Sequence, residues 1–359
     1  MPLLYDTAHF DCAMASRGDN CLNVGLINNM PDAAFEVTER QFIEVIRAAT
    51  NNAVVSLKLF SISDVPRADR VRHILAQRYR DVSQLWNTRV DGLIVTGTEP
   101  HAASLKDEPY WARLTEVIDW ARENTISTIW SCLAAHAAVL RADGIERHRL
   151  PNKQFGVFDC QVAAHPMMHN VRGSLRVPHS RYNDLAEQPL TGCGYKILTR
   201  STVAGVDTFC KHERSFFLFF QGHPEYDSDT LLREYRRDIR RFLRGEQQHY
   251  PANPHGYFSG AQMAIANKFR DRALVDRRDE LIDSFPMTSL EVAHESTRRT
   301  KSIEIYRNWI GYLRARKAEE QVSTVLVRQT WRDSPRRPPP KSDSSAKLGS
   351  GAKSCGDWG

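Results

Sequence analysis

The sequence predicts an α/β fold in which a doubly wound, mostly parallel sheet is flanked by helices. Short apolar runs alternate with amphipathic helical segments as far as Leu140, which is the order expected of parallel strands joined by right-handed crossovers. The runs are apolar along most of their length, as in strands that are covered on both faces. After Gly144 the predicted strands become short, which indicates an antiparallel or mixed part joined to the first sheet.

The first half of the chain supplies four strand and helix pairs. The predicted strands are residues 22–27 (LNVGLI), 54–60 (VVSLKLF), 92–96 (GLIVT) and 125–130 (TISTIW). The predicted helices are a segment after Pro31 with Phe35, Phe42, Ile43 and Ile46 on its apolar side, and residues 71–85, 111–123 and 134–140. This regular alternation predicts right-handed crossovers and a doubly wound parallel sheet.

The second half adds short strands and then helices. Strands are predicted at residues 156–162, 195–199, 202–209 and 216–220, and helices at residues 227–243, 261–282 and 302–316. We therefore divide the chain into an N-terminal extension (1–20), a catalytic α/β domain (21–258), a helical extension that packs on it (259–328) and a tail (329–359). The tail carries six basic and three acidic residues and a run of three prolines, a composition typical of disorder.

Composition limits the function classes. The formal net charge is +6, and half of it falls in the predicted tail, so no folded basic face indicates nucleic-acid binding. No secretion signal or membrane-spanning run is visible, which predicts a cytoplasmic protein. The seven cysteines are scattered without CxxC spacing, which predicts neither a disulfide framework nor a metal site.

Cys132 is the first candidate for chemistry. It lies in a sharp turn between the strand ending at Trp130 and a helix of small residues. Such a turn lifts one side chain out of the sheet, and the partial positive charge at a helix N-terminus favours a thiolate there. The N–H of Leu133 would be one oxyanion donor, and a second is expected from the loop near Thr98. A cysteine buried at the end of a strand is the alternative interpretation.

His223 and Glu225 are the second candidate. They flank a proline directly after the apolar strand 216–220, so an imidazole and a carboxylate can reach one site as a base and its orienting acid. His136, four residues after Cys132, is the second choice of base, ahead of His101 and His179. A surface turn that happens to contain a histidine is the alternative.

At these residues the chain resembles the homoserine O-succinyltransferase and O-acetyltransferase family, which has a class I glutamine amidotransferase-like fold. The resemblance covers residues 22–258 and resumes at the last helix. It rests on VGLINNMP (24–31), DGLIVTG (91–97), YW (110–111), FGVF (155–158), PHSR (178–181), GHPEYD (222–227), TL (230–231), EYRRD (234–238) and NWI (308–310).

The resemblance implies roles for individual residues. Cys132 corresponds to the acyl-thioester nucleophile, His223 to the general base and Glu225 to its supporting acid. The family's substrate contacts correspond to Lys153, Ser180, Glu234 and Arg237, and the position that separates acetyl from succinyl donors corresponds to His101. Arg237 suits an amino acid's carboxylate and Glu234 its ammonium group, although both could equally lie on a solvated helix face.

Two departures leave the substrates open. Residues 32–34 are Asp-Ala-Ala where the family usually has a lysine, and Cys132 is followed by Leu133 rather than tryptophan. The resulting prediction is an acyltransferase that uses acetyl-CoA or succinyl-CoA as co-substrate, homoserine or a related amino acid as acceptor, and no permanently bound cofactor or metal. Apolar faces on the last helices are compatible with a homodimer.

Two other functions remain alternatives. The first is a glutamine amidase, because the same fold also joins a cysteine to His-x-Glu, although glycines usually flank that nucleophile and Ser131 and Leu133 occupy those positions here. The second is a catalytically silent binding protein on the same scaffold. No nucleic-acid or membrane partner is predicted.

Overall fold

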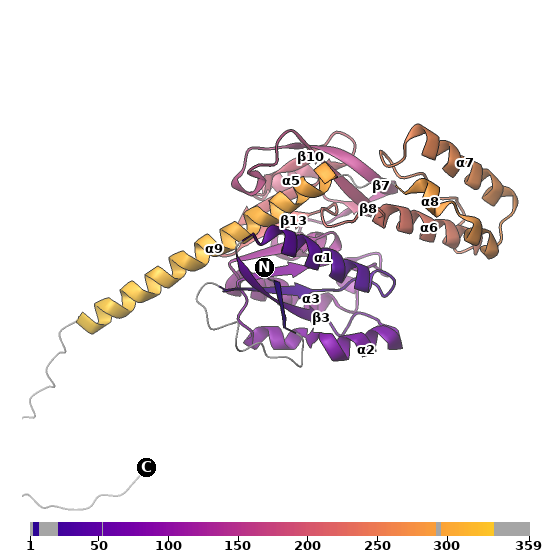
Figure 1. The fold of residues 1–359 in the computed structure, drawn as a ribbon. Helices are drawn as coiled ribbons and strands as arrows, with labels where there is room; N and C mark the ends of the chain where they lie inside the picture. Colours follow the sequence, from indigo (N-terminus) through magenta and orange to yellow (C-terminus); the bar gives the residue numbers. More distant parts are fainter. Residues whose placement is uncertain (1–2, 7–20, 52, 292–295, 334–359) are drawn as a thin grey trace, which may run out of the picture. The chain divides into compact units, whose positions relative to one another are not determined.

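A computed structural model describes residues 3–6, 21–51, 53–291 and 296–333. The chain divides into two compact units, Met1–Lys317 and Ala318–Gly359, and both sheets lie in the first. Figure 1 shows its elements in chain order. Its described cysteines, Cys21, Cys132, Cys160, Cys193 and Cys210, are all free.

A large sheet forms the centre of this unit, with the strand order β1-β3-β2-β5-β6-β13-β12-β9 among the described residues and β4 beside β3. All neighbours from β1 to β13 pair in parallel, whereas β12 pairs antiparallel with both β13 and β9. The strands are β1 Leu3–Asp6, β2 Cys21–Ile27, β3 Val54–Ser61, β4 Arg80–Asp81, β5 Gly92–Val95, β6 Ser127–Ser131, β9 Lys196–Ile197, β12 Thr208–His212 and β13 Phe216–Phe220. The predicted fold class is confirmed.

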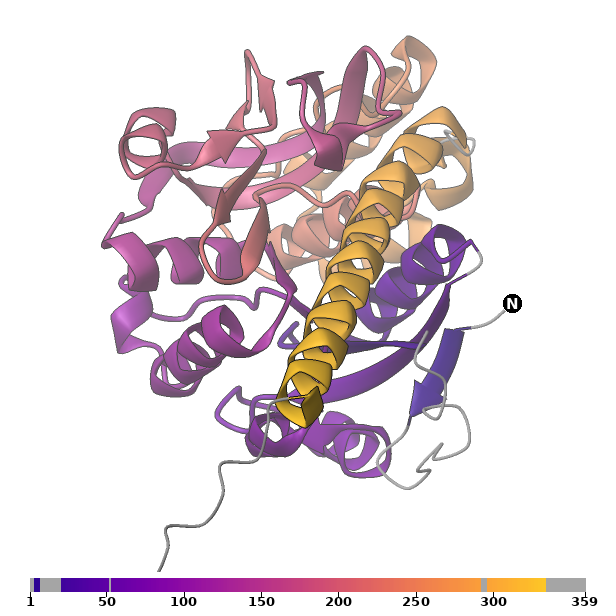
Figure 2. The same cartoon turned by 90° about the vertical axis from the view of Figure 1, so that its left-hand side faces the viewer.

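Helices cover both faces of this sheet, which is why its central strands are apolar throughout. In β13, Phe216, Leu218 and Phe220 face one core and Phe217 and Phe219 face the other. The first core contains α1 and α9, and the second contains α3 and α4. Figure 2 shows the part of α9 up to Lys317 crossing the same face of the sheet as α1.

The helices are α1 Phe35–Ala49, α2 Asp69–Arg78, α3 Trp111–Asn124, α4 Leu133–Asp143, α5 Glu187–Gly192, α6 Thr230–Leu243, α7 Gly260–Val275, α8 Met287–Leu290 and α9 Ser296–Asp333, with single 3-10 turns η1 Val82–Asn87, η2 Leu105–Asp107, η3 Pro166–Met168 and η4 Asp279–Ser284. Among the described residues, no helix is long and apolar enough to cross a membrane.

Two predicted helices are shorter than expected. The segment 71–85 leaves the helix at Tyr79, whose buried hydroxyl donates to Glu39 of α1 at 2.7 Å and turns the chain into β4. The segment 261–282 ends at Val275, because the Arg277 guanidinium donates to the carbonyl of Phe242 at 2.7 Å and holds the chain against α6. In both places a tertiary contact overrides the helical periodicity.

A second, antiparallel sheet has the order β11-β10-β7-β8 among the described residues. Its strands are β7 His148–Val162, β8 Ser174–Asp184, β10 Thr199–Ser201 and β11 Gly205–Val206. The antiparallel character predicted after Gly144 is confirmed, but β8 was not predicted. Its sequence contains Pro178 and many polar residues, so it has no apolar run to indicate a strand.

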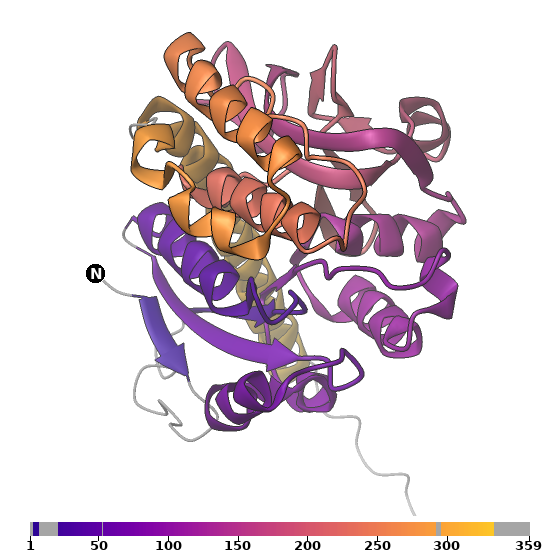
Figure 3. The ribbon, with the colours of Figure 1, turned by 90° about the vertical axis from the view of Figure 1, so that its right-hand side faces the viewer.

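The helices α6, α7 and α8 lie together beside β7 and β8 (Figures 1 and 3). They share a third core with Phe155 and Val157 of β7, centred on the buried Tyr235. The predicted boundaries at residues 21, 259 and 329 stay a prediction. Residues 334–359 of the predicted tail lie outside the described residues, and residues 329–333 belong to α9.

Candidate active site

Cys132 sits in a strained turn between β6 and α4. Its φ of 54° and ψ of −118° lie outside the regions that non-glycine residues prefer, and it is the residue directly before the first turn of α4. Its backbone N–H donates to the carbonyl of Phe220 at 2.7 Å, which fixes the turn to the end of β13. The side chain is therefore held at the N-terminal end of a helix, as the sequence predicted.

Parallel pairing brings the base to this cysteine. In the register of β6 and β13, Ser131 lies opposite Phe220, so the residues that follow each strand leave the sheet at the same edge. The His223 ring reaches Cys132, and its Nδ1 lies 2.8 Å from Glu225 Oε1. The sheet therefore brings together the three residues predicted as nucleophile, base and orienter.

The electrostatics of this group favour a charged imidazole. Burial by itself lowers the pKa of His223, but the Glu225 carboxylate, which bonds to the ring, and the nearby Cys132 sulfur outweigh burial and raise that pKa well above its ordinary value. The Tyr226 ring stacks on the His223 ring with centroids 4.2 Å apart and fixes its plane. The imidazole can therefore hold a proton between two acceptors.

The competing histidines have other partners. His136 lines the same cavity, but its Nε2 bonds to Gln221 at 2.9 Å, and burial lowers its pKa to about 3, so it stays neutral. His101 contributes no atom to the cavity lining, and its backbone N–H donates to Glu108 at 2.7 Å. Its predicted role in donor choice stays a prediction.

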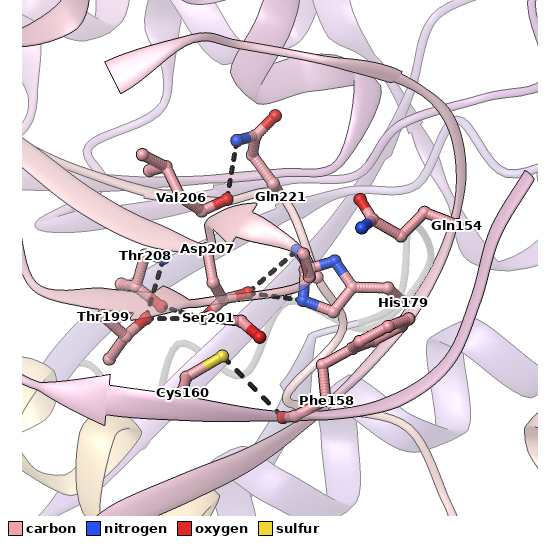
Figure 4. A network of polar contacts seen from close by, with 12 residues as sticks. Gln154, Phe158, Cys160, His179, Thr199, Ser201, Val206, Asp207, Thr208 and Gln221 are labelled. Atoms are coloured by element: carbon pink, nitrogen blue, oxygen red, sulfur yellow. Dashed lines mark hydrogen bonds and ion pairs between the residues drawn. The ribbon is translucent and has the colours of Figure 1, made fainter. Parts of the chain in front are cut away.

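A buried polar network supports the turn that carries His223 (Figure 4). Asp207 accepts from the Gly222 N–H at 3.1 Å and from the hydroxyls of Thr199 and Thr208 at 2.7 and 2.8 Å. His179 Nε2 lies 3.3 Å from the same carboxylate. A Cβ on Gly222 would lie 2.6 Å from Asp207 Oδ1, so only glycine fits here without rearrangement.

Neighbouring side chains define the protonation states of His179 and Asp207. Arg181 Nε donates to His179 Nδ1 at 3.1 Å, which leaves the ring proton on Nε2, facing Asp207. Burial lowers the pKa of His179, so the ring is neutral. Burial raises the pKa of Asp207, but the His179 ring 3.3 Å away and the hydroxyls of Thr199 and Thr208 outweigh it and lower that pKa, so the carboxylate is charged.

Cys132 and His223 open into a cavity of about 310 Å³. The predicted substrate contacts also line it, together with both predicted oxyanion positions: Lys153, Ser180, Glu234, Arg237, Leu133 and Thr98. A larger hollow of about 600 Å³ lies over residues 264–276 and contains no predicted site residue. Because its walls come from α7 and the residue after it, it offers no convergent chemistry.

The predicted substrate contacts form one linked group on the wall of the cavity. Lys153 Nζ lies 2.6 Å from Asp238, and Arg237 Nε donates to the same carboxylate at 3.0 Å. Ser180 Oγ and the Tyr226 hydroxyl both donate to Glu234. Burial raises the pKa of Asp238, but Lys153 and Arg237 outweigh it and lower that pKa, so Asp238 is charged.

Several residues of the site were not predicted as such. Asp238 and Tyr226 adjoin the predicted Arg237 and Glu225, and their neighbours in the sequence could have indicated them. Asp207 and Arg147 follow no recognisable spacing, because only the fold brings them to the site.

Comparisons with known proteins assign the chain to a family. A sequence model of the family described as homoserine O-succinyltransferase matches residues 10–319. A homoserine O-succinyltransferase of Rhodopseudomonas palustris is 46% identical over 296 residues, covering 82% of this chain and 89% of that protein. One of Bradyrhizobium japonicum is 46% identical over 294 residues, covering 81% and 90%.

The chain belongs to the homoserine O-succinyltransferase family. It is thus an acyltransferase by family, with a role in methionine biosynthesis, as the sequence motifs indicated. Among solved structures, a glutamine amidotransferase of Methylobacillus flagellatus matches with 15% identity and a TM-score of 0.46, covering 81% of this chain and 94% of that one. One from Thermotoga maritima matches with 11% identity and a TM-score of 0.44, covering 81% and 98%.

Proposed function

We propose that this member of the homoserine O-succinyltransferase family transfers an acyl group from acyl-CoA to the hydroxyl of homoserine, through a thioester on Cys132. The observation that carries the proposal is the grouping of Cys132, His223 and Glu225 at a strained strand-to-helix turn that opens into a cavity: Glu225 bonds to the His223 ring, and the ring interacts with the Cys132 sulfur. A nucleophile, a base and an orienting acid in this order are the groups that covalent acyl transfer requires.

The first half-reaction moves the acyl group to the enzyme. The Cys132 sulfur attacks the thioester carbonyl, its proton is held by His223, and the negative oxygen is stabilised by the N–H of Leu133. As the first residue of α4, Leu133 has no acceptor for this N–H within the helix. When the intermediate collapses, the bond to the CoA sulfur breaks, and His223 returns the proton to that sulfur.

The second half-reaction uses the same groups in reverse. His223 takes the proton from the acceptor hydroxyl, the oxygen attacks the Cys132 thioester, and the released sulfur regains a proton. Glu234 suits the acceptor's ammonium group and Arg237 its carboxylate. A thioester intermediate keeps the activation of the donor, so no metal or resident cofactor is required by this mechanism.

The family assignment favours this reaction over the glutamine amidase and over a silent binding protein. The residues that flank Cys132 favour it too, because Ser131 and Leu133 stand where an amidase usually has glycines. A cytoplasmic location and a homodimer stay predictions.

Intact-protein mass spectrometry tests the proposal directly. Mixing the full chain with succinyl-CoA or acetyl-CoA, without acceptor, is expected to add one acyl mass, which homoserine then removes as the O-acyl product. Cys132→Ala is expected to abolish the added mass. Cys193→Ala is the matched control, because Cys193 is also free and partly exposed but does not line the cavity.

Two results would contradict the proposal. One is an unchanged acyl mass in Cys132→Ala, which would place the thioester elsewhere. The other is ammonia released from glutamine with no acyl mass from any acyl-CoA, which would support the amidase.

A further inference from the structure

Arg147 is a cation of the catalytic cavity that has no acidic partner in contact. It lies in the short segment between α4 and β7, where Gly144 adopts a left-handed conformation and the buried Ile145 anchors the chain. Its side chain lines the same cavity as Cys132. Among the described residues, no hydrogen bond or ion pair to its guanidinium is present.

The other basic residues of the cavity differ from it. Lys153 and Arg237 are paired with Asp238, and Arg181 lies 2.6 Å from Asp184. Arg241 lies 3.3 Å from Glu99. Arg149, which also has no acidic partner in contact, is exposed at the rim, with its guanidinium 5.5 Å from the Tyr182 ring centre. Arg147 therefore combines partial burial with an unpaired charge.

The surroundings of Arg147 favour an anion that comes from outside the protein. Burial lowers its pKa, but an arginine remains charged at neutral pH, and a partly desolvated charge without a partner is costly. Glu108 and Glu146 are near enough to interact electrostatically with Arg147, but neither makes a hydrogen bond or ion pair to it among the described residues. Glu108 Oε1 accepts the N–H groups of His101 and Ala102, each at 2.7 Å, and Glu146 is paired with Lys106 at 3.0 Å. An incoming carboxylate could occupy both arms of the guanidinium fork.

The position of Cys132 indicates where a bound acyl group would lie. Its sulfur and Arg147 line the same cavity and interact electrostatically. An acyl group on that sulfur extends into the cavity. If it carries a carboxylate two methylene groups beyond the thioester, that carboxylate lies roughly 5 Å from the sulfur in an extended chain. Such a carboxylate would therefore lie inside the cavity that Arg147 lines.

We propose that Arg147 is a specificity-determining residue, which binds the distal carboxylate of a dicarboxylic acyl group while that group is attached to CoA and then to Cys132. The proposal rests on the thioester mechanism given above. The relatives' name, homoserine O-succinyltransferase, already indicates a dicarboxylic acyl donor, and the proposal concerns the residue that binds its distal carboxylate, leaving Arg237 and Glu234 to the amino-acid acceptor.

The test compares succinyl-CoA with butyryl-CoA, which have acyl chains of equal carbon number and differ in the distal carboxylate. The rate of acylation of Cys132 is measured by quenched-flow mass spectrometry in the full chain. Arg147→Gln is expected to slow acylation by succinyl-CoA on the order of 10- to 100-fold and to leave acylation by butyryl-CoA within about twofold. Arg147→Lys, which keeps the charge but not the fork, is expected to fall between the two.

Arg149→Gln is the matched control, because it removes an arginine two residues away at the exposed rim and is expected to leave the ratio of the two rates unchanged. Equal slowing of both donors in Arg147→Gln would overturn the proposal, since a contact to the CoA phosphates affects every donor alike. Normal acylation with a raised KM for homoserine would also overturn it, by moving Arg147 to the acceptor.

A different result would contradict the proposed function itself. If the unmodified protein gains no acyl mass from either donor, the thioester mechanism is wrong. If it gains the mass and only the donor ratio is insensitive to Arg147, the mechanism stands and the assignment of Arg147 is wrong. Melting temperatures of Arg147→Gln and Arg149→Gln within about 3 °C of wild type would show that these two variants are folded like the wild type.

Discussion

Gly97 gives the sharpest test of the oxyanion site. It follows β5, lines the catalytic cavity and packs against the first residue of α4. A Cβ added to Gly97 would lie 2.9 Å from the Leu133 nitrogen and 3.0 Å from its Cβ. Ordinary contacts of this kind begin at 3.4 Å, so the methyl group of Gly97→Ala must displace backbone by about 0.5 Å or block the N–H.

Gly97→Ala is expected to lower the stability of the protein moderately and to slow catalysis strongly. Overpacking by one methyl group destabilises a packed site by about 1 to 3 kcal/mol. Loss of one oxyanion donor slows acyl transfer by about 10²- to 10³-fold. We therefore expect Gly97→Ala to fold with a lowered melting temperature and to acylate Cys132 at least 100-fold more slowly at saturating acyl-CoA.

Gly311→Ala is the matched control. Gly311 is in α9, and a Cβ there meets no atom within 4 Å. The change is expected to stabilise the protein by about 0.5 to 1 kcal/mol, because alanine is the better helix former, and to leave acylation unchanged. Wild-type acylation by Gly97→Ala would refute the assignment of the Leu133 N–H as an oxyanion donor.

Three further predictions concern charged groups. Glu225→Gln is expected to lower the pKa of His223, which NMR of the ring nitrogens reports, and to slow transfer by about 10²- to 10⁴-fold, whereas an unchanged rate would exclude an orienting role. His136 has a folded pKa of about 3, below its ordinary 6.5, so the unfolded chain binds the extra proton and stability is lost as the pH falls from 6.5 towards 3. Between pH 7 and pH 5, wild type should lose roughly 2 kcal/mol more in urea unfolding than His136→Gln, and equal losses would contradict this. Lys317→Met leaves the buried Asp91, 2.7 Å away, without its partner and should cost about 3 to 5 kcal/mol, part of which Asp91→Asn should restore in the double variant.

Local patterns were sufficient where a segment's neighbours in the sequence decide its structure. The apolar runs at β2, β3, β5 and β13 and the periodicity of α1 and α3 predicted those elements to within a few residues. The pattern failed at Tyr79 and Arg277, where a side chain reaches another helix and stops the expected one. The pattern also missed β8. This strand is stabilised by antiparallel pairing with β7, and its own residues show no strand pattern.

The site shows the same division. The sequence by itself determined the fold class, the sharp turn at Cys132 and the pairing of His223 with Glu225, because each depends on patterns local to a few residues. Only the tertiary structure decided that β6 and β13 are neighbours and that Asp207 accepts a hydrogen bond from the Gly222 N–H. It also decided that Arg147 lines the cavity without an acidic partner in contact among the described residues. These contacts join residues from distant parts of the chain, and their geometry is fixed by packing and hydrogen bonding in three dimensions, which a linear pattern does not record.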